Sequence, residues 1–272
     1  MQDGQTQSMA ASTRTREREL ADARLEAEGC RRCGLWRDAT QVVFGEGLAR
    51  ARAMLVGEQP GDAEDRAGQP FVGPAGVLLR KLIAEVGLEE RDLYVTNAVK
   101  HFKWRPKGTR RIHDKPNWTE VQACNHWLRL ELAHVQPEVV VCLGSTAAQA
   151  LLGREARVYA LRGAAHRPAE LDAEVVVTIH PSAVLRAGEQ RSERRAELLE
   201  DLALARSLLA VSADRTGVHL TAPENEGSSQ MPSSRLRGRT RDQLYEEARE
   251  KGVEGRSKMT KAELARAVGR RG

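Results

Sequence analysis

The segment Glu138-Val139-Val140-Val141-Cys142-Leu143-Gly144 decides the fold, because apolar residues follow one another without interruption until a glycine ends the run. Valines at consecutive positions place β-branched side chains on both faces of a strand, as in a parallel sheet that helices cover on each side. The next residues, 145–152, have the periodicity of a short helix. Together the two segments predict one strand–helix unit of an α/β domain.

The same alternation of apolar runs and helical patterns extends over most of the chain. We predict strands at 41–44, 53–57, 93–97, 138–144 and 174–180, and helices at 12–29, 75–86, 119–132, 145–152 and 192–211. This order predicts a doubly wound parallel sheet in a domain of roughly 180 residues, which is large enough to bury one core. Such folds bind ligands at the carboxyl ends of their strands, where Glu58, Asn97 and His180 lie in this sequence.

Composition limits the classes of protein to which the chain can belong. Of its 272 residues, 40% are hydrophobic, 30% are charged and 4% are aromatic. The apolar runs are far shorter than the ~20 residues of a membrane helix, and residues 1–29 lack the apolar stretch of a secretory signal. Four cysteines are too few for a disulfide scaffold. We therefore exclude membrane, secreted and fibrous proteins, and expect a monomer in the cytoplasm.

Charge and composition divide the chain into three parts. The formal net charge is +5, and residues 235–272 alone hold 12 Lys/Arg against 6 Asp/Glu. A basic chain of this kind favours a polyanionic partner. Residues 213–234 lack periodicity and are rich in Gly, Pro and Ser, which is typical of a flexible linker. We predict a domain at 1–212, this linker, and a small basic helical module at 235–272 with helices near 240–249 and 260–268.

The four cysteines form a close pair and two more distant members. Cys30 and Cys33 lie in a polar turn where both thiols can face one ion, whereas Cys124 lies in a predicted helix and Cys142 in a predicted strand. One interpretation is a four-cysteine site for Zn²⁺ or an iron–sulfur cluster, between which the spacing does not decide. The other interpretation is that Cys142 and Cys124 are small buried hydrophobic residues.

The stretch Gly-Glu-Gln-Pro-Gly-Asp-Ala-Glu-Asp at 57–65 follows a predicted strand directly. A strand that ends at residue 57 delivers Glu58 and Gln59 into a cleft, and the Pro-Gly turn allows a ligand to approach the backbone closely. Phe71, in the Pro-Phe-Val-Gly loop that comes next, is able to stack on a planar base. The alternative is an ordinary strand–turn–helix junction, with acidic residues at a helix start and a small local core around the phenylalanine.

Two further polar residues end predicted strands. Asn97 can form paired hydrogen bonds with the edge of a pyrimidine, or can be an ordinary asparagine between a strand and a loop. His180, followed by Pro-Ser, ends a buried strand at the edge expected for a site, although lone histidines are more often structural.

Residues 100–115 form a basic segment with interleaved aromatic side chains. It holds seven Lys/Arg and one acidic residue together with Phe102 and Trp104, and Pro106 and Gly108 rule out a regular helix. This composition is typical of contacts with phosphates and bases. We predict a long functional loop that contacts nucleic acid, the alternative being a solvated charged loop.

Together these motifs resemble the signature of the family 4 uracil-DNA glycosylases. The similarity covers residues 30–210 and rests on Gly-Glu-Gln-Pro-Gly at 57–61, Glu64-Asp65, Phe71, Asn97, His180-Pro-Ser, and Cys-x2-Cys followed by Cys-x17-Cys. Gln59, where the family usually has alanine, and the sequence Arg110-Arg-Ile-His113 resemble the UdgX branch. Thr109 departs from that branch, which commonly has lysine there.

The resemblance implies a [4Fe–4S] cluster and a set of site residues. The implied cluster ligands are Cys30, Cys33, Cys124 and Cys142. The implied catalytic residues are His113, Glu58, Gln59 and His180. The implied substrate-binding residues are Asp62, Asp65, Phe71, Asn97, Arg111 and Ser182. In this scheme Phe71 stacks on an extruded uracil, His180 stabilises the departing base, and Arg111 helps to hold the loop against phosphates.

The UdgX resemblance also implies an unusual outcome, in which His113 becomes bonded to the sugar carbon that carried uracil. The expected partner is uracil-containing DNA, with single strands favoured because extrusion of the base then costs less. Two alternatives stay open: a conventional multiple-turnover uracil-DNA glycosylase, and a non-catalytic iron–sulfur protein that binds DNA.

The basic tail resembles a different kind of unit, the short helical module at the N-terminus of the Rho terminator and in SAP-like domains. The similarity rests on Leu-Tyr-Glu-Glu-Ala at 244–248 and Gly-Arg-Ser-Lys-Met-Thr-Lys-Ala-Glu-Leu at 255–264. It implies nucleic-acid binding that raises the local concentration of DNA. The alternative is a tail that only increases solubility.

Overall fold

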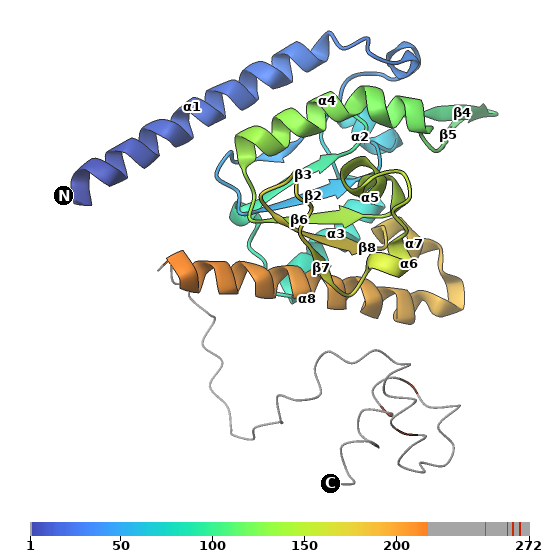
Figure 1. Ribbon diagram of the computed structural model, residues 1–272. Coiled ribbons are helices and arrows are strands. Elements are labelled where there is room, and N and C mark those ends of the chain that lie inside the picture. The colour runs from blue at the N-terminus through green and yellow to red at the C-terminus, as the bar shows by residue number, and fades with distance from the viewer. Residues whose placement is uncertain (1, 217–247, 249–259, 261–262, 264–266, 268–272) are drawn as a thin grey trace. The chain divides into compact units, whose positions relative to one another are not determined.

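A computed structural model describes residues 2–216 together with residues 248, 260, 263 and 267. Its centre is a six-stranded sheet in the order β1-β3-β2-β6-β8-β7 (Figure 1). Four strands are parallel: β2 (Ala53–Gly57), β3 (Leu93–Asn97), β6 (Val139–Leu143) and β8 (Glu174–Thr178). The two antiparallel edge strands are β1 (Glu46–Gly47) and β7 (Ala165–His166). The predicted α/β class and its parallel sheet are confirmed.

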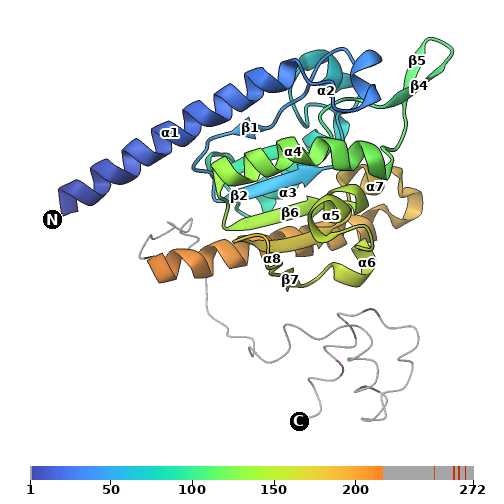
Figure 2. The same cartoon turned by 45° about the horizontal axis from the view of Figure 1, so that its top comes forward.

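Helices cover both faces of this sheet (Figures 1 and 2). One layer contains α1 (Gln2–Glu28), α4 (Trp118–Val135) and α5 (Ser145–Leu152), and the opposite layer contains α3 (Pro74–Glu85), α7 (Pro181–Arg186) and α8 (Arg191–Thr216). Shorter helices are α2 (Asp62–Ala67), α6 (Val158–Leu161) and the 3-10 turns η1 (Gly34–Arg37), η2 (Glu90–Asp92) and η3 (Gly188–Gln190).

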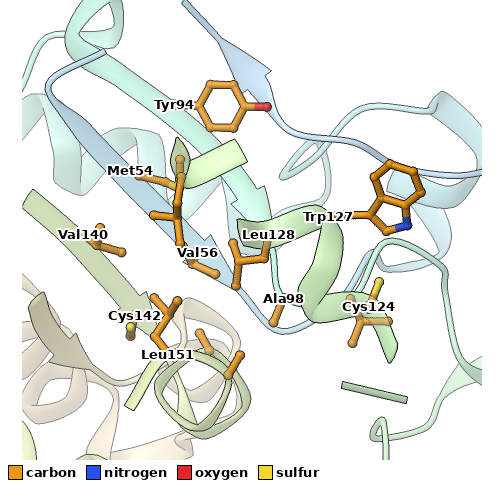
Figure 3. Close-up of a cluster of buried hydrophobic side chains, with 14 of the residues drawn as sticks. Met54, Val56, Tyr94, Ala98, Cys124, Trp127, Leu128, Val140, Cys142 and Leu151 are labelled. Atoms are coloured by element: carbon orange, nitrogen blue, oxygen red, sulfur yellow. The ribbon is translucent and has the colours of Figure 1, made fainter. Parts of the chain in front are cut away.

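The apolar strands separate two cores, one on each side of the sheet. Met54, Val56 and Val140 pack with α4 and α5, as Figure 3 shows, whereas the intervening Leu55 and Val141 pack with α3 and α8. Successive side chains of a strand point to opposite faces, so uninterrupted valine runs can serve both cores. This double burial explains why the apolar runs predicted the strands so closely.

The structure corrects two of the expected elements. Residues 41–44 form no strand. Thr40 and Gln41 form hydrogen bonds with α2, and Val43 donates its N–H to the carbonyl oxygen of Lys100, after the end of β3, at 2.8 Å. The basic segment is a hairpin rather than an irregular loop, with β4 at Trp104–Lys107 and β5 at Arg110–His113. Gly108 adopts φ 59°, which suits the tight two-residue turn of a hairpin.

The C-terminal predictions lie mostly outside the described residues, including the linker at 213–234 and the helices near 240–249 and 260–268. The chain divides into two compact units, Met1–Leu220 and Thr221–Gly272. Within the second unit, the N–H of Thr260 donates to Glu263 Oε2 at 2.7 Å and the hydroxyl of Thr260 donates to the same oxygen at 2.8 Å. This is the arrangement of a helix start. None of the helices that the structure describes is long and apolar enough to cross a bilayer.

A buried ion pair joins the end of β3 to α4. Lys100 Nζ lies 2.5 Å from Glu131 Oε2 and 2.8 Å from the carbonyl oxygen of Asn97, and both charged side chains are almost completely excluded from solvent. The carboxylate of Glu131 also accepts hydrogen bonds from Thr96 Oγ1 and from the N–H of Gly45. The network therefore holds the backbone that presents Asn97. Removing either charge of the Lys100–Glu131 pair would leave the other charge buried without a partner, which lowers the stability of the fold.

Glu131→Gln keeps the size and most hydrogen-bonding atoms of this side chain but removes its charge. We expect it to lower the free energy of unfolding by about 3–5 kcal/mol, because the ammonium of Lys100 is then buried without a counter-charge. Urea unfolding followed by circular dichroism measures this change. The matched control is Glu89→Gln, which breaks the exposed pair of Glu89 with Arg91 (2.8 Å) and should change stability by less than about 1 kcal/mol. Equal effects of both substitutions would contradict the role given to the buried pair.

Candidate active site

A cavity of about 1640 Å³ opens at the carboxyl ends of the parallel strands. The hairpin and the helices α5, α6 and α7 gather at this end of the sheet in both views (Figures 1 and 2). Glu58, Asn97 and His180, which follow β2, β3 and β8, all line the cavity. The site that the strand ends predicted is therefore formed by residues that lie far apart in the sequence.

Asn97 and Phe71 form the floor of the cavity, and a glycine allows them to come together. A Cβ atom added to Gly57 would lie 2.3 Å from Asn97 Oδ1 and 2.6 Å from the ring of Phe71. Phe71 itself has φ 55°, a left-handed conformation that costs a non-glycine residue about 1–3 kcal/mol. Arg80 Nη1 supports this strained turn with a 3.1 Å hydrogen bond to the carbonyl of Phe71. An amide and an aromatic face are thus presented side by side.

His180 occupies the start of α7 in a defined protonation state. The backbone N–H of Ser182 donates to His180 Nδ1 at 3.1 Å, and Ser182 Oγ lies 2.8 Å from the same nitrogen. Because a backbone N–H can only donate, Nδ1 carries a lone pair and the proton of the neutral ring is on Nε2. Burial lowers the pKa of His180 to about 4, although the charge of Glu58 opposes the shift. The ring is also stacked with Phe71, with 6.1 Å between centroids. Ser182, expected to bind substrate, lines the cavity and holds this histidine.

The hairpin brings His113 to a carboxylate in the cavity. His113 Nε2 lies 3.3 Å from Glu58 Oε1, and the histidine side chain is 47% exposed. Thr146 Oγ1 donates to the other carboxylate oxygen at 2.5 Å. Burial raises the pKa of Glu58, but the hydrogen bonds from His113 and Thr146 outweigh it, so the pKa lies below its usual value. The glutamate is therefore ionised near neutral pH. Thr146 was missed from the sequence, although it lies in the first turn after β6.

Gln59 holds both strands at the base of the hairpin. Its Nε2 donates to the carbonyl oxygens of Lys103 and Asp114 at 3.0 Å each, and its Oε1 accepts from the N–H of Lys103 at 3.1 Å. The side chain is buried, with all of these groups engaged by backbone. The resemblance places Gln59 at the sugar, whereas the structure makes it a positioning residue for the hairpin that carries His113.

An ion pair fixes the hairpin from its other side. Arg111 Nη1 lies 2.6 Å from Asp65 Oδ2, and Arg111 Nε lies 2.5 Å from Asp62 Oδ1. Asp65 is fully buried and also accepts hydrogen bonds from the N–H and hydroxyl of Thr40. Asp65 and Arg111, expected to meet substrate and phosphate, are thus paired with each other, whereas Asp62 pairs with Arg111 and also lines the cavity. The exposed cations of the hairpin are Arg105, Lys107 and Arg110.

Comparison of the sequence with known proteins identifies the family of this chain. The family model of the uracil DNA glycosylase superfamily matches residues 44–203, which is more than half of the chain. This chain belongs to the uracil-DNA glycosylase superfamily. The type-4 uracil-DNA glycosylase of Thermotoga maritima is 36% identical over 198 residues, which cover 72% of this chain and 97% of that protein. The type-4 protein of Pyrobaculum aerophilum is 36% identical over 177 residues, covering 63% and 87%. A type-5 protein of the same organism is 30% identical over 200 residues, covering 66% and 83%.

Three of the four cysteines lie together in this superfamily member. The indole N–H of Trp127 donates to Cys30 Sγ and the backbone N–H of Lys100 donates to Cys124 Sγ, both at 3.1 Å. Burial raises the pKa of Cys124 to about 12, Lys100 opposes this shift, and the nearby sulfur atoms of Cys33 and Cys30 add to it. Over the part of the chain that the structure describes, however, no three His, Cys, Asp or Glu side chains converge closely enough to hold a metal ion.

Cys142 lies apart from this group. It is completely buried in β6 between β2 and β8, and burial alone raises its pKa to about 12. Figure 3 shows its sulfur well apart from that of Cys124. The fourth ligand position that the resemblance assigned to Cys142 does not agree with the structure. The alternative, in which this cysteine is a small hydrophobic residue of the core, does agree with it.

His101 was not considered from the sequence, yet it directly follows the residue whose backbone binds Cys124. That residue is Lys100, and His101 itself is 4% exposed. Its Nδ1 is buried without a hydrogen-bond partner among the described residues, and burial lowers its pKa. A buried neutral imidazole with an unused nitrogen is suited to bind a metal. The unpartnered Nδ1 of His101 makes this residue a candidate fourth donor beside Cys30, Cys33 and Cys124.

The shifted pKa of His180 can be observed directly. We expect one of the seven histidines to titrate with a midpoint about 4, because burial disfavours the charged imidazolium. The ring is then neutral from about pH 5 upward, and protonation below that range opposes the folded state. NMR titration of histidine ring carbons measures the midpoint, and its disappearance in His180→Asn assigns the signal. A midpoint near 6.5 for His180 would show that its ring is solvated.

Proposed function

We propose that this chain excises uracil from DNA and stays covalently joined, through His113, to C1′ of the resulting abasic sugar. The observation that carries the proposal is the position of His113, on an anchored hairpin and 3.3 Å from the carboxylate of Glu58. The relatives named as type-4 uracil-DNA glycosylases support the first half of the proposal. The Arg-Arg-Ile-His resemblance to the UdgX branch supports the second.

Recognition would begin with an extruded base in the cavity. Phe71 offers an aromatic face and Asn97 offers an amide at the floor, which together suit stacking and edge recognition of a pyrimidine. Extruding a base costs a few kcal/mol in a duplex and less in a single strand. We therefore propose single-stranded uracil-containing DNA as the favoured substrate.

Cleavage of the N1–C1′ bond leaves its electron pair on uracil and makes the sugar carbon electron-poor. The Nε2–H of His180 would donate to uracil O2 and stabilise the developing anion, with no proton transfer required from this buried neutral ring. A single donor of this kind typically contributes about 10²–10³ in rate. The ionised carboxylate of Glu58 would stabilise the positive sugar from the other side.

Capture would follow when a ring nitrogen of neutral His113 donates its lone pair to C1′. One N–C1′ bond forms as the other breaks, uracil takes up a proton from solvent, and no water adds to the sugar. The alkylated imidazole is positively charged unless it loses its remaining N–H proton, and Glu58 lies where it can offset that charge. Gln59 and the Arg111–Asp65 ion pair hold the hairpin, so the histidine would be aligned before water can compete.

A denaturing gel distinguishes this proposal from both alternatives. Wild-type protein is mixed with an equal amount of labelled single-stranded oligonucleotide that contains one uracil, then heated with detergent. We expect a slow band of protein joined to DNA in near-stoichiometric yield. Free abasic product without that band would instead establish a conventional glycosylase. If no uracil is released, the remaining alternative is a non-catalytic DNA-binding protein.

His113→Ala tests the nucleophile. We expect the slow band to disappear while uracil release continues, because Asn97, Phe71 and His180 are left in place and water can then reach the sugar. The gel and a base-release assay measure the two outcomes on the same samples. His134→Ala, which removes an imidazole paired with Glu19 outside the cavity, is the matched control and should leave the band unchanged. A full yield of adduct in His113→Ala would remove this residue from the mechanism.

We further propose that Cys30, Cys33, Cys124 and His101 hold a [4Fe–4S] cluster. Such a cluster would bind together the turn after α1, the segment after β3 and α4, and so would support the backbone below Asn97. We expect Cys124→Ala and His101→Ala to lose iron and the absorbance near 400 nm. Cys142→Ala, a matched cysteine substitution, should retain both. Iron loss in Cys142→Ala with full retention in His101→Ala would restore the four-cysteine assignment.

A further inference from the structure

The cavity continues beyond the residues that the proposed chemistry uses. Its volume of about 1640 Å³ exceeds the ~300–1,000 Å³ of pockets that enclose a small ligand. The additional space lies between the end of α5, the start of α6 and α7, and its walls include Arg154, Arg157, Tyr159 and Arg186. We call these four residues the groove extension. A single nucleotide bound at Phe71 and Asn97 would not need this part of the cavity.

Tyr159 is an exposed aromatic side chain that is held in place. The residue is 63% exposed, in a chain with only three tyrosines. The guanidinium of Arg194 lies 5.3 Å from the centre of its ring, and Arg194 is itself held 2.9 Å from Glu197. The cation–π contact limits the ring's motion without burying it. A fixed, open aromatic ring beside a nucleotide pocket is suited to stack on a second base.

The charges around Tyr159 suit a polyanion. Arg154, Arg157 and Arg186 are all exposed in the groove extension, and the only acidic residue lining this part among those described is Glu155. Glu155 pairs with Nη2 of Arg157 at 3.1 Å, with both side chains largely exposed, so this ion pair is weak. Nη1 of Arg157 donates to the backbone carbonyl oxygens of Arg154 and Ala156, which hold the guanidinium at the rim of the groove extension. Arginines interleaved with an aromatic residue are the usual composition of a groove for single-stranded nucleic acid.

We propose that the groove extension binds the DNA strand on one side of the extruded uridine. Tyr159 stacks on a flanking base, and the three arginines contact the phosphates of that flank. This inference rests on the proposed function, since it assumes that a uridine occupies the pocket above Phe71 and Asn97. The groove extension would be a second binding subsite, so the affinity for DNA would depend on the nucleotides that flank the uridine.

The experiment measures binding of full-length protein to labelled single-stranded oligonucleotides by fluorescence anisotropy. The oligonucleotides carry 2′-fluoro-2′-deoxyuridine, whose glycosidic bond resists cleavage, with either both flanks, the 5′ flank alone or the 3′ flank alone. We expect Tyr159→Ala to raise the Kd of the two-flank oligonucleotide roughly 5- to 100-fold, as loss of one stacked base does. Tyr159→Phe keeps the aromatic ring and should bind within about twofold of wild type.

Trimming identifies the contact. Removal of the contacted flank should weaken wild-type binding by more than Tyr159→Ala does, because the phosphate contacts are lost with the stacked base, and the same removal should weaken the alanine variant by a smaller factor than wild type, because only the arginine contacts are then left to lose. Removal of the opposite flank should weaken both proteins equally. A Tyr159→Ala Kd within twofold of wild type on the two-flank oligonucleotide would overturn the proposal and would mean that Tyr159 is only a solvated surface residue.

The arginines are tested through the salt dependence of the same Kd. Arg157→Ala should lower the slope of log Kd against log salt by about one, because one phosphate contact is lost. The matched control is Arg91→Ala, which removes an equally exposed arginine that also pairs with a nearby glutamate but lies outside the cavity. Equal slopes for both variants would remove Arg157 from the subsite.

Failure of this inference can be told apart from failure of the proposed function. If wild type releases no uracil on the denaturing gel, the proposed function fails, whatever Tyr159 does. If uracil is released normally but Tyr159→Ala binds as wild type does, only the groove extension fails.

Discussion

The ion pair between Arg111 and Asp65 is the constraint on which the arrangement of the site depends. Asp65 is fully buried in α2, and the hairpin strand that carries Arg111 ends two residues later at His113. A fully buried carboxylate must be paired, so removing Arg111 would leave a charge that the core cannot accommodate. The pair therefore ties the hairpin to α2, and Gln59 ties its two strands to β2. His113, which the hairpin places beside Glu58, is thus positioned by contacts made elsewhere in the hairpin.

Two titratable side chains of the site, Glu58 and His180, differ in ionisation state near neutral pH. Glu58 stays charged because His113 and Thr146 donate to it, whereas His180 stays neutral because it is buried and accepts from the backbone at α7. A negative group and a neutral donor on two sides of one cavity suit a reaction in which positive charge develops on one fragment and negative charge on the other. The charge of Glu58 and the neutrality of His180 both follow from the contacts of each side chain.

Much of the fold and part of the site could be predicted from the sequence. The runs at 53–57, 93–97 and 138–144 identified parallel strands, because short runs rich in apolar and β-branched residues are typical of strands buried on both faces. Asn97 and His180 were placed in the site by the rule for strand ends. The segment at 41–44 was misassigned because its apolar residues are buried in a loop rather than paired in a sheet. The local pattern of apolar residues indicates that a segment is buried, but burial alone does not distinguish a strand from a buried loop.

Periodicity and chain order in the sequence were enough to predict the layered α/β architecture, the sheet edge at which the cavity forms and the types of residue that gather there. The partner of each polar group became visible in the folded chain. Gln59, Asp65 and Ser182 were read as groups that meet substrate, but each is engaged by the protein. Cys142 matched a spacing but is buried within the sheet, whereas His101 follows the residue that binds Cys124 and has an unpartnered ring nitrogen. Contacts between segments tens of residues apart depend on how helices and strands pack, and this information is absent from any short motif.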